Sequence, residues 1–533
     1  MDASKSAEDD APSDTLPSLR LLIIAKGEEV RKLRASGEAA TAAASVKELL
    51  GLKERYKRLA GEEYNAKPKR RLEPAEGEAV HGKRAKQAPL AKAVAGPPVD
   101  PTPPTAETFP AWEPRPFFGF EVVHRSSKPG SRARVGRITT PHGIIDTPAF
   151  VPVGTNGALK AIDERQSVEA GTQLMFCNTY HLLVHPGPDI VRRAGGLHRF
   201  MGHAGPIITD SGGFQVFSLV NVTQPHTPWT LTLTSDPNPH PHPNPNSIPN
   251  NQVFSLAEPS SDDGPEMKSK SKTRTAREGG SASLLRVDEQ GAVFRSYHDG
   301  RVIELTPESS VLAQKDLGSD IIIPLDELPG HHISRERLAQ SVRLSHRWMA
   351  RSLRQHLADP RQQAMYAVVH GGTDEALRHE SAEYLSSLPF DGFAIGGSLG
   401  QDRGEMLTLL EFLIPHLPTD KPNHLLGIAD PESAEAVAPL GVDTLDSCNP
   451  TRIARHGMLL CKGGAIKIKQ GRFADDFGPI DPECATITHS RAYLHHLFKQ
   501  HEPLFMTLAS QHNLIFMNAL MADIRQRILR DEL

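Results

Sequence analysis

From about residue 116 onward, short apolar runs alternate with longer amphipathic stretches. Eight apolar runs have the length of buried strands. They are residues 149–153, 174–177, 207–208, 321–323, 366–369, 393–395, 425–428 and 442–445. Helical periodicity lies between several of them, at 335–356, 375–388, 405–417 and 431–438. Continuous apolar strands that alternate with amphipathic helices indicate parallel βα units. Eight such units favour an α/β fold of the (β/α)8 TIM-barrel type over an open sheet.

The first 115 residues follow a different pattern. Residues 1–16 are polar and are predicted to be disordered. Residues 17–64 have apolar positions at helical spacing and many basic residues, which predicts a helical hairpin. Residues 65–115 are rich in Pro, Ala and Lys and are predicted to be a linker. The globular part is therefore predicted to span residues 116–533.

One segment interrupts the alternating pattern. The pentapeptide Gln215–Leu219 recurs verbatim as Gln252–Leu256, and a low-complexity stretch of His, Pro and Asn lies between the copies. Removal of residues 215–251 would rejoin the flanking sequence smoothly. We therefore predict a low-complexity insertion over 220–287, which is either a duplicated or retained non-coding stretch or a disordered insertion in a loop.

Composition limits where the protein works and what it binds. A net charge of −4 means that any affinity for nucleic acid must come from local basic patches. Four cysteines in 533 residues do not make a disulfide framework, which fits a reducing compartment. No apolar run has the length of a membrane span, and the acidic N-terminus is unlike a signal peptide. A cytoplasmic location is expected. The nucleus is the alternative, because Lys67–Arg71 and Lys83–Lys86 are basic clusters that fit either a nuclear address or a solvated linker.

Two acidic residues stand out by their position. Asp210 and Asp446 each follow an apolar run and precede residues such as Gly or Pro that turn the chain. Acids at the end of a buried strand suggest a site rather than a core, because the carboxyl ends of barrel strands carry the catalytic groups. Two such carboxylates allow a nucleophile and an acid/base to act at one carbon. Asp326, His370 and Gly396–Gly397 also end predicted strands.

Several widely spaced motifs carry a family resemblance. They are Thr140–Gly143, Pro148–Thr155, Asn178–Leu182, Gly195–His198, Thr209–Leu219, Gly392–Gly397, Asp446–Arg452 and Ser490–Leu497. With these motifs the chain resembles the tRNA-guanine transglycosylase family, and in particular its eukaryotic queuine tRNA-ribosyltransferase branch. In the N-terminal hairpin, Gly27–Leu33, Val46–Leu50 and Leu52–Lys57 resemble a WHEP domain. That resemblance implies a general grip on tRNA through its phosphates.

The family resemblance implies a reaction and a set of roles. The reaction is a pentosyl transfer that exchanges guanine at the wobble position of tRNA for queuine, through a covalent ribosyl-aspartate intermediate. Asp446 matches the family's nucleophile and Asp210 its acid/base. Recognition and binding of the base would fall to Asp326, His370, Gly397, Phe214, Leu426, Ser211 and Gly400. A small residue at Gly400 would leave room for the cyclopentenediol of queuine, whereas the choice between queuine and its precursor base stays open. Arg452 and Arg455 are candidates for contacts with anticodon-loop phosphates.

The sequence departs from the family at two important places. His370 stands where the family has a Gln that binds the base, so a pH dependence in the range where His titrates is expected. The family's C-x-C-x-x-C zinc cluster is shortened here and keeps only Cys484, with His512 matching the downstream histidine and His489 as a further candidate. These are at most three ligands, below the four of a closed zinc site. We therefore expect hydrophobic packing in place of the metal in the C-terminal subdomain, with zinc retention as the alternative.

Two other functions remain open. The chain could be a non-catalytic tRNA-binding partner subunit, or a transglycosylase inactivated by the insertion and by the lost zinc ligands. The presence of both Asp210 and Asp446 argues against the partner subunit. The expected partners are tRNA, guanine and queuine. The expected assembly is a homodimer or a heterodimer with a non-catalytic paralogous subunit.

Overall fold

The computed structural model describes residues 102–218, 283–329, 333–483 and 487–533, together with 39–60 and a few residues between 22 and 30. The chain divides into two compact units, Met1–Val94 and Ala95–Leu533. Within the described residues, no helix is both long and apolar enough to span a membrane.

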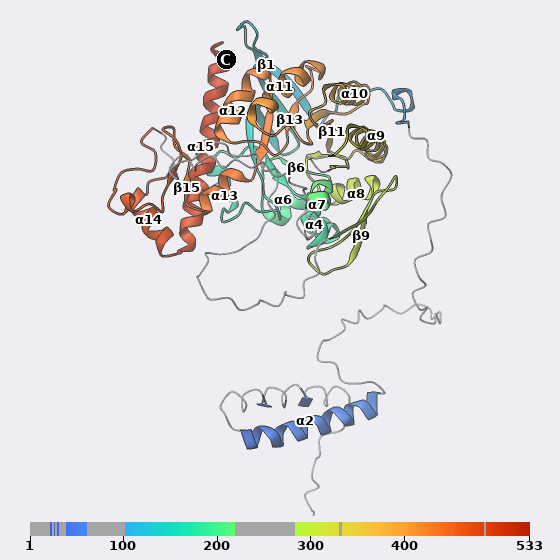
Figure 1. The fold of residues 1–533 in the computed structure, drawn as a ribbon, viewed down its shortest axis with the longest axis vertical. Helices are drawn as coiled ribbons and strands as arrows, with labels where there is room; N and C mark the ends of the chain where they lie inside the picture. The colour runs from blue at the N-terminus through green and yellow to red at the C-terminus, as the bar shows by residue number, and fades with distance from the viewer. Residues whose placement is uncertain are drawn as a thin grey trace, which may run out of the picture. The chain divides into compact units, whose positions relative to one another are not determined.

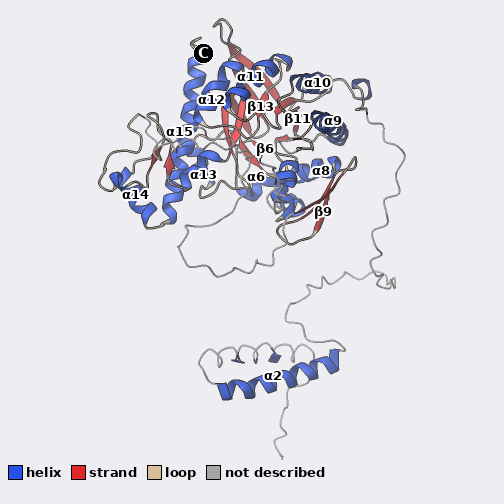
Figure 2. Ribbon diagram, in the orientation of Figure 1, coloured by secondary structure: helices blue, strands red, loops and turns tan. Residues whose placement is uncertain are grey.

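An eight-stranded parallel sheet forms the centre of the larger unit (Figures 1 and 2). Its strands are β4 (Ala149–Pro152), β5 (Met175–Cys177), β6 (Ile207–Thr209), β10 (Ile321–Ile322), β11 (Ala364–Val369), β12 (Gly392–Ile395), β13 (Asn423–Leu425) and β14 (Thr444–Ser447). Their order in the sheet is β4-β14-β13-β12-β11-β10-β6-β5. Each of the eight predicted apolar runs therefore overlaps one strand of this sheet.

The two edge strands of the sheet meet and close it into a barrel. A parallel bridge joins Val153 to Phe176, and the N–H of Gly154 donates to the carbonyl oxygen of Phe176 at 2.7 Å. Strands β4, β11 and β12 are buried at every position. They can consist almost wholly of apolar residues because both faces of a barrel strand are covered. The (β/α)8 prediction is confirmed.

Helices surround the barrel, and Figure 1 shows α8 to α12 around the central strands. Those that follow the strands of the second half are α9 (Arg335–Ala358), α10 (Glu375–Ser386), α11 (Arg403–Leu413) and α12 (Pro431–Val437). Each begins behind a Ser or Asp whose side chain accepts a backbone N–H of the first turn. The other helices of the unit are α3 (Glu164–Glu169), α4 (Thr179–Val184), α5 (Pro188–Arg193), α6 (Gly196–Met201), α7 (Gly213–Ser218), α8 (Pro307–Leu317), α13 (Asn449–Arg455), α14 (Arg491–Lys499) and α15 (Pro503–Leu529). Short 3₁₀ turns are η1 (Ala106–Thr108), η2 (Ile414–His416), η3 (Ala438–Leu440) and η4 (Gly471–Phe473).

Three small antiparallel sheets are added to the barrel. They are β1 (Gly119–Arg125) with β2 (Arg134–Thr140) and β3 (Gly143–Thr147), β7 (Ser283–Val287) with β8 (Ala292–Arg295) and β9 (Val302–Leu305), and β15 (Met458–Leu459) with β16 (Ile466–Lys467). The C-terminal part has its own apolar core, which includes Leu459, Phe473, Ile480 and Leu494, and Cys461 packs against it. This core agrees with the predicted C-terminal subdomain.

Two predicted boundaries differ from the structure. Regular structure begins before residue 116, because Phe109 is buried in the main core and Trp112 donates from Nε1 to Asp391 at 3.0 Å. The aromatic side chains anchor a segment whose proline content suggested a linker. At the other boundary, Ser283–Val287 is strand β7 and not the end of a loop, because it pairs with β8. The remainder of the predicted insertion, from 219 to 282, lies outside the described residues.

In the N-terminal unit the structure describes helix α2 (Ala39–Ala60) and a few helical residues of an earlier segment. Ile23 and Tyr56 are buried together, with Leu49 and Leu52 against them. Lys26 pairs with Glu29 at 3.0 Å and with Glu48 at 2.5 Å. The two segments therefore pack against each other as the predicted hairpin requires.

Candidate active site

The predicted site residues gather at one end of the barrel. Asp210 follows β6, His370 follows β11, and Leu426 follows β13, while Asp446 lies within the last half of β14. Asp326 lies four residues beyond the end of β10. Because all eight strands are parallel, their carboxyl ends share one rim, and all five residues lie at this rim.

Asp210 is a buried carboxylate that accepts hydrogen bonds from several donors. Asn178 Nδ2 donates to its Oδ2 at 2.8 Å and the N–H of Thr179 donates to its Oδ1 at 2.7 Å. Gln215 Nε2 donates to Oδ2 at 3.0 Å. These hydrogen bonds lower the pKa of Asp210, but burial has the larger effect and raises it above the ordinary value. The environment therefore favours a group that can hold a proton and release it.

Asp446 is buried in a different way. Its Oδ1 accepts the N–H of Gly427 at 2.8 Å and faces Nε2 of His424 at 3.2 Å. Within the described parts of the chain, Oδ2 takes part in no hydrogen bond. One carboxylate oxygen is thus held while the other is left for a ligand.

Asp326 lies close to Asp210. Ser211 Oγ, next to Asp210 in the chain, is at 3.5 Å from Asp326 Oδ1. Burial raises the pKa of Asp326 to about 7, and the nearby Asp210 carboxylate adds to the effect. Asp326 is therefore poised between its neutral and ionised forms near neutral pH.

His370 has a buried imidazole with one unused nitrogen. Among the described residues its Nε2 has no hydrogen-bond partner. Burial lowers the pKa of His370 to about 3, so the ring is neutral at physiological pH. The predicted pH dependence of His370 near neutral pH was therefore wrong, because the surrounding apolar barrel disfavours its charged form. The unused nitrogen is available to a bound ligand.

The loops after β11 and β12 are tied together by one buried cation. Arg378 donates to the carbonyl oxygens of Val369 at 2.8 Å, Gly396 at 2.9 Å and Ser398 at 2.9 Å. Gly397 has φ +74°, and a Cβ there would lie 3.0 Å from Cβ of His370. The backbone at Gly397 and the ring of His370 are thus neighbours.

For Phe214, Leu426 and Gly400, the structure gives less direct support for the predicted contact with a base. Phe214 is 39% exposed and Leu426 is partly buried, so both can be covered by a ligand. Gly400 has φ +116°, and a Cβ there would lie 2.6 Å from Cβ of Glu405. This close approach to α11 is a structural reason for glycine, and room for the substituent of queuine stays a prediction.

Arg452 and Arg455 lie on α13, directly after β14, and their binding of phosphates is not tested by the structure.

The zinc ligands predicted from the sequence do not form a site among the described residues. Cys484 lies outside them. His512 is fully buried, and its Nε2 donates to the carbonyl oxygen of Leu460 at 2.7 Å, so this nitrogen does not face a metal. His489 has a buried Nδ1 with no hydrogen-bond partner in the described chain. A donor set that fits zinc is therefore absent from the described part of the subdomain.

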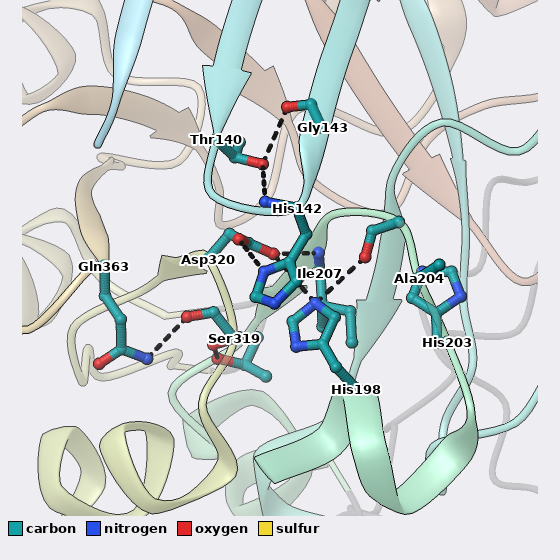
Figure 3. Close-up of polar contacts among 12 residues, drawn as sticks. Thr140, His142, Gly143, His198, His203, Ala204, Ile207, Ser319, Asp320 and Gln363 are labelled. Atoms are coloured by element: carbon teal, nitrogen blue, oxygen red, sulfur yellow. Dashed lines mark hydrogen bonds and ion pairs between the residues drawn. The ribbon is translucent and has the colours of Figure 1, made fainter. Parts of the chain in front are cut away.

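In the described chain, one other group has three closely spaced donors of metal-binding type, namely His142, His198 and Asp320 (Figure 3). His198 Nε2 faces two acceptors, the Gly205 oxygen at 3.1 Å and Asp320 Oδ2 at 3.3 Å, so this nitrogen carries a hydrogen. The rings of His142 and His198 stack with centroids 3.4 Å apart and an angle of 11°. A metal in the plane of one ring would then lie well out of the plane of the other, so a hydrogen-bonded network describes this group better than a metal site.

That network is also remote from the candidate active site. Asp320 Oδ2 accepts the N–H of Ile207, the first residue of β6, at 2.8 Å. The opposite end of the same strand leads to Asp210. The three residues therefore join the β2–β3 turn, α6 and the start of β10 at the amino ends of the strands.

Sequence reasoning missed the partners of the two central acids. Asn178 and Gln215 belong to motifs already singled out, so their position in those motifs was an available signal. His424 lies inside strand β13, and nothing in the local sequence indicated a contact with Asp446. Only the pairing of His424 with Thr444 across β13 and β14 reveals it.

Comparison with known proteins identifies related sequences. Residues 128–234 and 267–533 match the family described as queuine tRNA-ribosyltransferase, and residues 19–70 match the WHEP-TRS domain. A queuine tRNA-ribosyltransferase of Protochlamydia amoebophila is 51% identical over 418 residues, which are 78% of this chain and 96% of the relative. Relatives of the same name from Chlamydia felis and Chlamydia trachomatis are 46% and 44% identical over 78% of this chain and 99% of each relative. The unmatched stretch between 234 and 267 falls within the predicted insertion.

Proposed function

Because the chain belongs to the queuine tRNA-ribosyltransferase family and is thus a pentosyltransferase, we propose that it replaces guanine at the wobble position of tRNA with queuine through a covalent ribosyl-aspartate intermediate. One observation carries the proposal. Two buried carboxylates at the same end of the barrel have opposite environments: Asp210 is biased toward its protonated form, and Asp446 keeps an oxygen free of hydrogen bonds within the described chain. Groups with such divergent environments suit an acid/base and a nucleophile.

In the first half of the reaction, Oδ2 of Asp446 forms a bond to C1′ of the ribose. The bond from C1′ to the base nitrogen breaks, its electron pair leaves with guanine, and Asp210 supplies a proton to the departing base. In the second half, Asp210 accepts a proton from incoming queuine, whose nitrogen attacks C1′. The ester bond breaks and its electron pair restores the Asp446 carboxylate.

Base recognition is proposed for the groups around Asp326. An ionised Asp326 can accept from N1–H and the exocyclic amine of guanine. The unused Nε2 of His370 and the backbone at Gly397 lie side by side and offer further polar contacts. Ser211 approaches Asp326, while Phe214 and Leu426 would enclose the faces of the base.

Binding of tRNA is proposed to involve both units. Arg452 and Arg455 follow the strand that carries Asp446, where they would meet phosphates next to the exchanged nucleotide. The WHEP-TRS unit exposes Lys47, Arg55, Lys57 and Arg58 on α2. A second binding unit on the same chain raises the affinity for tRNA, because binding of one unit increases the effective concentration of tRNA at the other. A homodimer or a heterodimer with a non-catalytic paralogue, and a cytoplasmic or nuclear location, stay predictions.

No step of the proposed reaction passes through zinc. The described residues of the C-terminal subdomain form an apolar core around Leu459 and Phe473, and His512 is hydrogen-bonded to the backbone there. Packing of this kind can hold the subdomain together without a metal.

The decisive experiment is exchange of radiolabelled guanine into a tRNA with guanine at the wobble position. The wild-type protein should incorporate label, and Asp446→Ala should abolish incorporation because no carboxylate remains to attack C1′. Asp523→Asn, an exposed position on α15, serves as the matched control and should keep full activity. Label incorporation by Asp446→Ala would exclude Asp446 as the nucleophile.

The two alternatives give different results in the same assay. A non-catalytic partner subunit would bind tRNA without exchanging guanine. A transglycosylase inactivated by the insertion would gain activity when residues 215–251 are deleted, because the second copy of the pentapeptide then follows Phe214 directly. Equal exchange by the full chain and the deletion variant would show that the insertion is tolerated.

A further inference from the structure

His424 is a fully buried side chain whose ring contacts the carboxylate of Asp446. It lies on β13, and β13 pairs with β14 so that His424 is opposite Thr444. Side chains alternate along a strand, so Thr444 and Asp446 point to the same face of β14. The imidazole lies between them: its Nδ1 is 2.8 Å from Thr444 Oγ1 and its Nε2 is 3.2 Å from Asp446 Oδ1.

The contacts determine where the hydrogen of this ring must be. An ionised carboxylate only accepts hydrogen bonds, so Nε2 bears a hydrogen whenever Asp446 is ready to attack. In the neutral ring Nδ1 is then an acceptor, and the Thr444 hydroxyl can donate to it. The Thr444 hydroxyl has another acceptor within reach, the carbonyl oxygen of Asn423 at 3.4 Å, and its shorter contact with Nδ1 fits the tautomer that presents an N–H to Asp446.

We infer that His424 is a positioning residue for the nucleophile: its Nε2–H and the N–H of Gly427 together hold Oδ1 of Asp446 and leave Oδ2 to attack. This inference rests on the proposed role of Asp446. Both donors reach the same oxygen, at 3.2 and 2.8 Å. The two donors thus hold the carboxylate at Oδ1, and neither of them blocks Oδ2.

The two halves of the reaction use this contact differently. When Oδ2 bonds to C1′, Oδ1 becomes the carbonyl oxygen of the ester and carries less charge. When the ester breaks, the electron pair of the C1′–Oδ2 bond returns to the carboxylate and Oδ1 regains charge. An N–H that points at Oδ1 stabilises the departing carboxylate, so His424 should matter most for breakdown of the intermediate.

The test is a chase of the covalent adduct. Wild-type protein and variants are mixed with tRNA carrying guanine at the wobble position, quenched to measure the tRNA-protein adduct, and chased with excess guanine in single-turnover experiments. His424→Phe should slow loss of the adduct on the order of 10-fold to 100-fold, the effect of removing a hydrogen bond to a charged group. The adduct should also accumulate to a higher level during steady turnover.

A conservative variant that keeps a hydrogen-bond donor distinguishes a positioning role of His424 from a role in packing. His424→Gln keeps an N–H that can reach Oδ1 and should chase much closer to the wild-type rate. His356→Phe changes another fully buried histidine, on α9 at the side of Lys315, and should leave the chase rate unchanged. Thr444→Val keeps the imidazole but removes the donor to Nδ1, and it should slow the chase by roughly 3-fold to 10-fold. If His424→Phe does not fold, the chase rate of Thr444→Val tests the role of His424 instead.

The inference and the proposed function fail in different ways. Absence of an adduct in the wild-type protein, or its presence in Asp446→Ala, would overturn the proposed function. An adduct in the wild-type protein that chases equally fast from His424→Phe and Thr444→Val would overturn only the role of His424. Equal slowing in His424→Phe and His424→Gln would also overturn it, because the ring would then act through its shape.

Discussion

Gln215 donates from Nε2 to Oδ2 of Asp210 at 3.0 Å, so the repeated pentapeptide supplies a direct partner of the proposed acid/base. Gln215 belongs to the first copy, which forms most of helix α7. Val216 of the same copy is buried against Tyr180 and Leu325. The first copy therefore occupies the position that the site requires, whatever the origin of the second.

Substitution of Gln215 should impair exchange without unfolding the protein. Gln215→Ala removes one of the donors to Asp210, and we expect guanine exchange to fall roughly 10-fold, in line with a hydrogen bond to a charged group. Thermal unfolding should change little. Gln526→Ala, at an exposed position of α15, is the control. Wild-type exchange by Gln215→Ala would mean that Asn178 and Thr179 suffice to orient Asp210.

The affinity for guanine should rise with pH through the titration of Asp326. Its pKa is raised to about 7, chiefly by burial, and only the ionised form accepts both guanine donors. We expect the KM for guanine to fall between about pH 6 and pH 8. Asp326→Asn should weaken guanine binding and remove this pH dependence. A pH-independent KM in the wild-type protein would contradict the assignment.

The same group makes a prediction for stability. The unfolded pKa of Asp is about 3.9 and the folded pKa of Asp326 is about 7, so the folded protein binds more protons between these values. The contribution of Asp326 to the free energy of unfolding is therefore largest below about pH 4 and is lost as the pH rises to about 7, by up to about 4 kcal/mol. Denaturant unfolding of the wild type and Asp326→Asn over this range measures the difference in slope.

His370 should contribute contacts but no titration near neutral pH. Its pKa is lowered to about 3, chiefly by burial, so the ring stays neutral where the enzyme is assayed. His370→Gln restores the side chain that the family resemblance implies and should keep the KM for guanine within about 3-fold. His370→Ala should raise that KM roughly 10-fold. A difference between the wild type and His370→Gln in the pH profile of the KM for guanine would show that the imidazole titrates.

Removal of metal should not unfold the C-terminal subdomain. The described residues there pack around Leu459, Phe473 and Leu494, and His512 is bound to the backbone through Nε2. We expect the protein treated with a strong chelator to keep its Tm and its guanine exchange. Elemental analysis of the purified protein is the accompanying measurement. One equivalent of zinc with a lower Tm after chelation would show that Cys484 and its neighbours bind the metal after all.

The sequence predicted the barrel because most of its strands lie in short, largely apolar runs. Val368 and Ala394, for example, are buried inside such runs, and parallel strands leave this signal even without an alignment. It predicted Asp210 and Asp446 because both follow such runs. It could not predict His424, because a histidine within a strand shows its role only through the neighbour on the next strand. The anchoring of Trp112 was missed for the same reason, since its partner Asp391 is distant in sequence.

Arg378 couples the two loops that we propose to bind the base. One guanidinium holds the carbonyl oxygens of Val369, Gly396 and Ser398, so a shift of either loop is passed to the other. Substitutions at His370 and at Gly397 should then have non-additive effects on base affinity, which a double-mutant cycle measures as a coupling energy. We therefore expect that a change of base specificity would need coordinated changes in both loops.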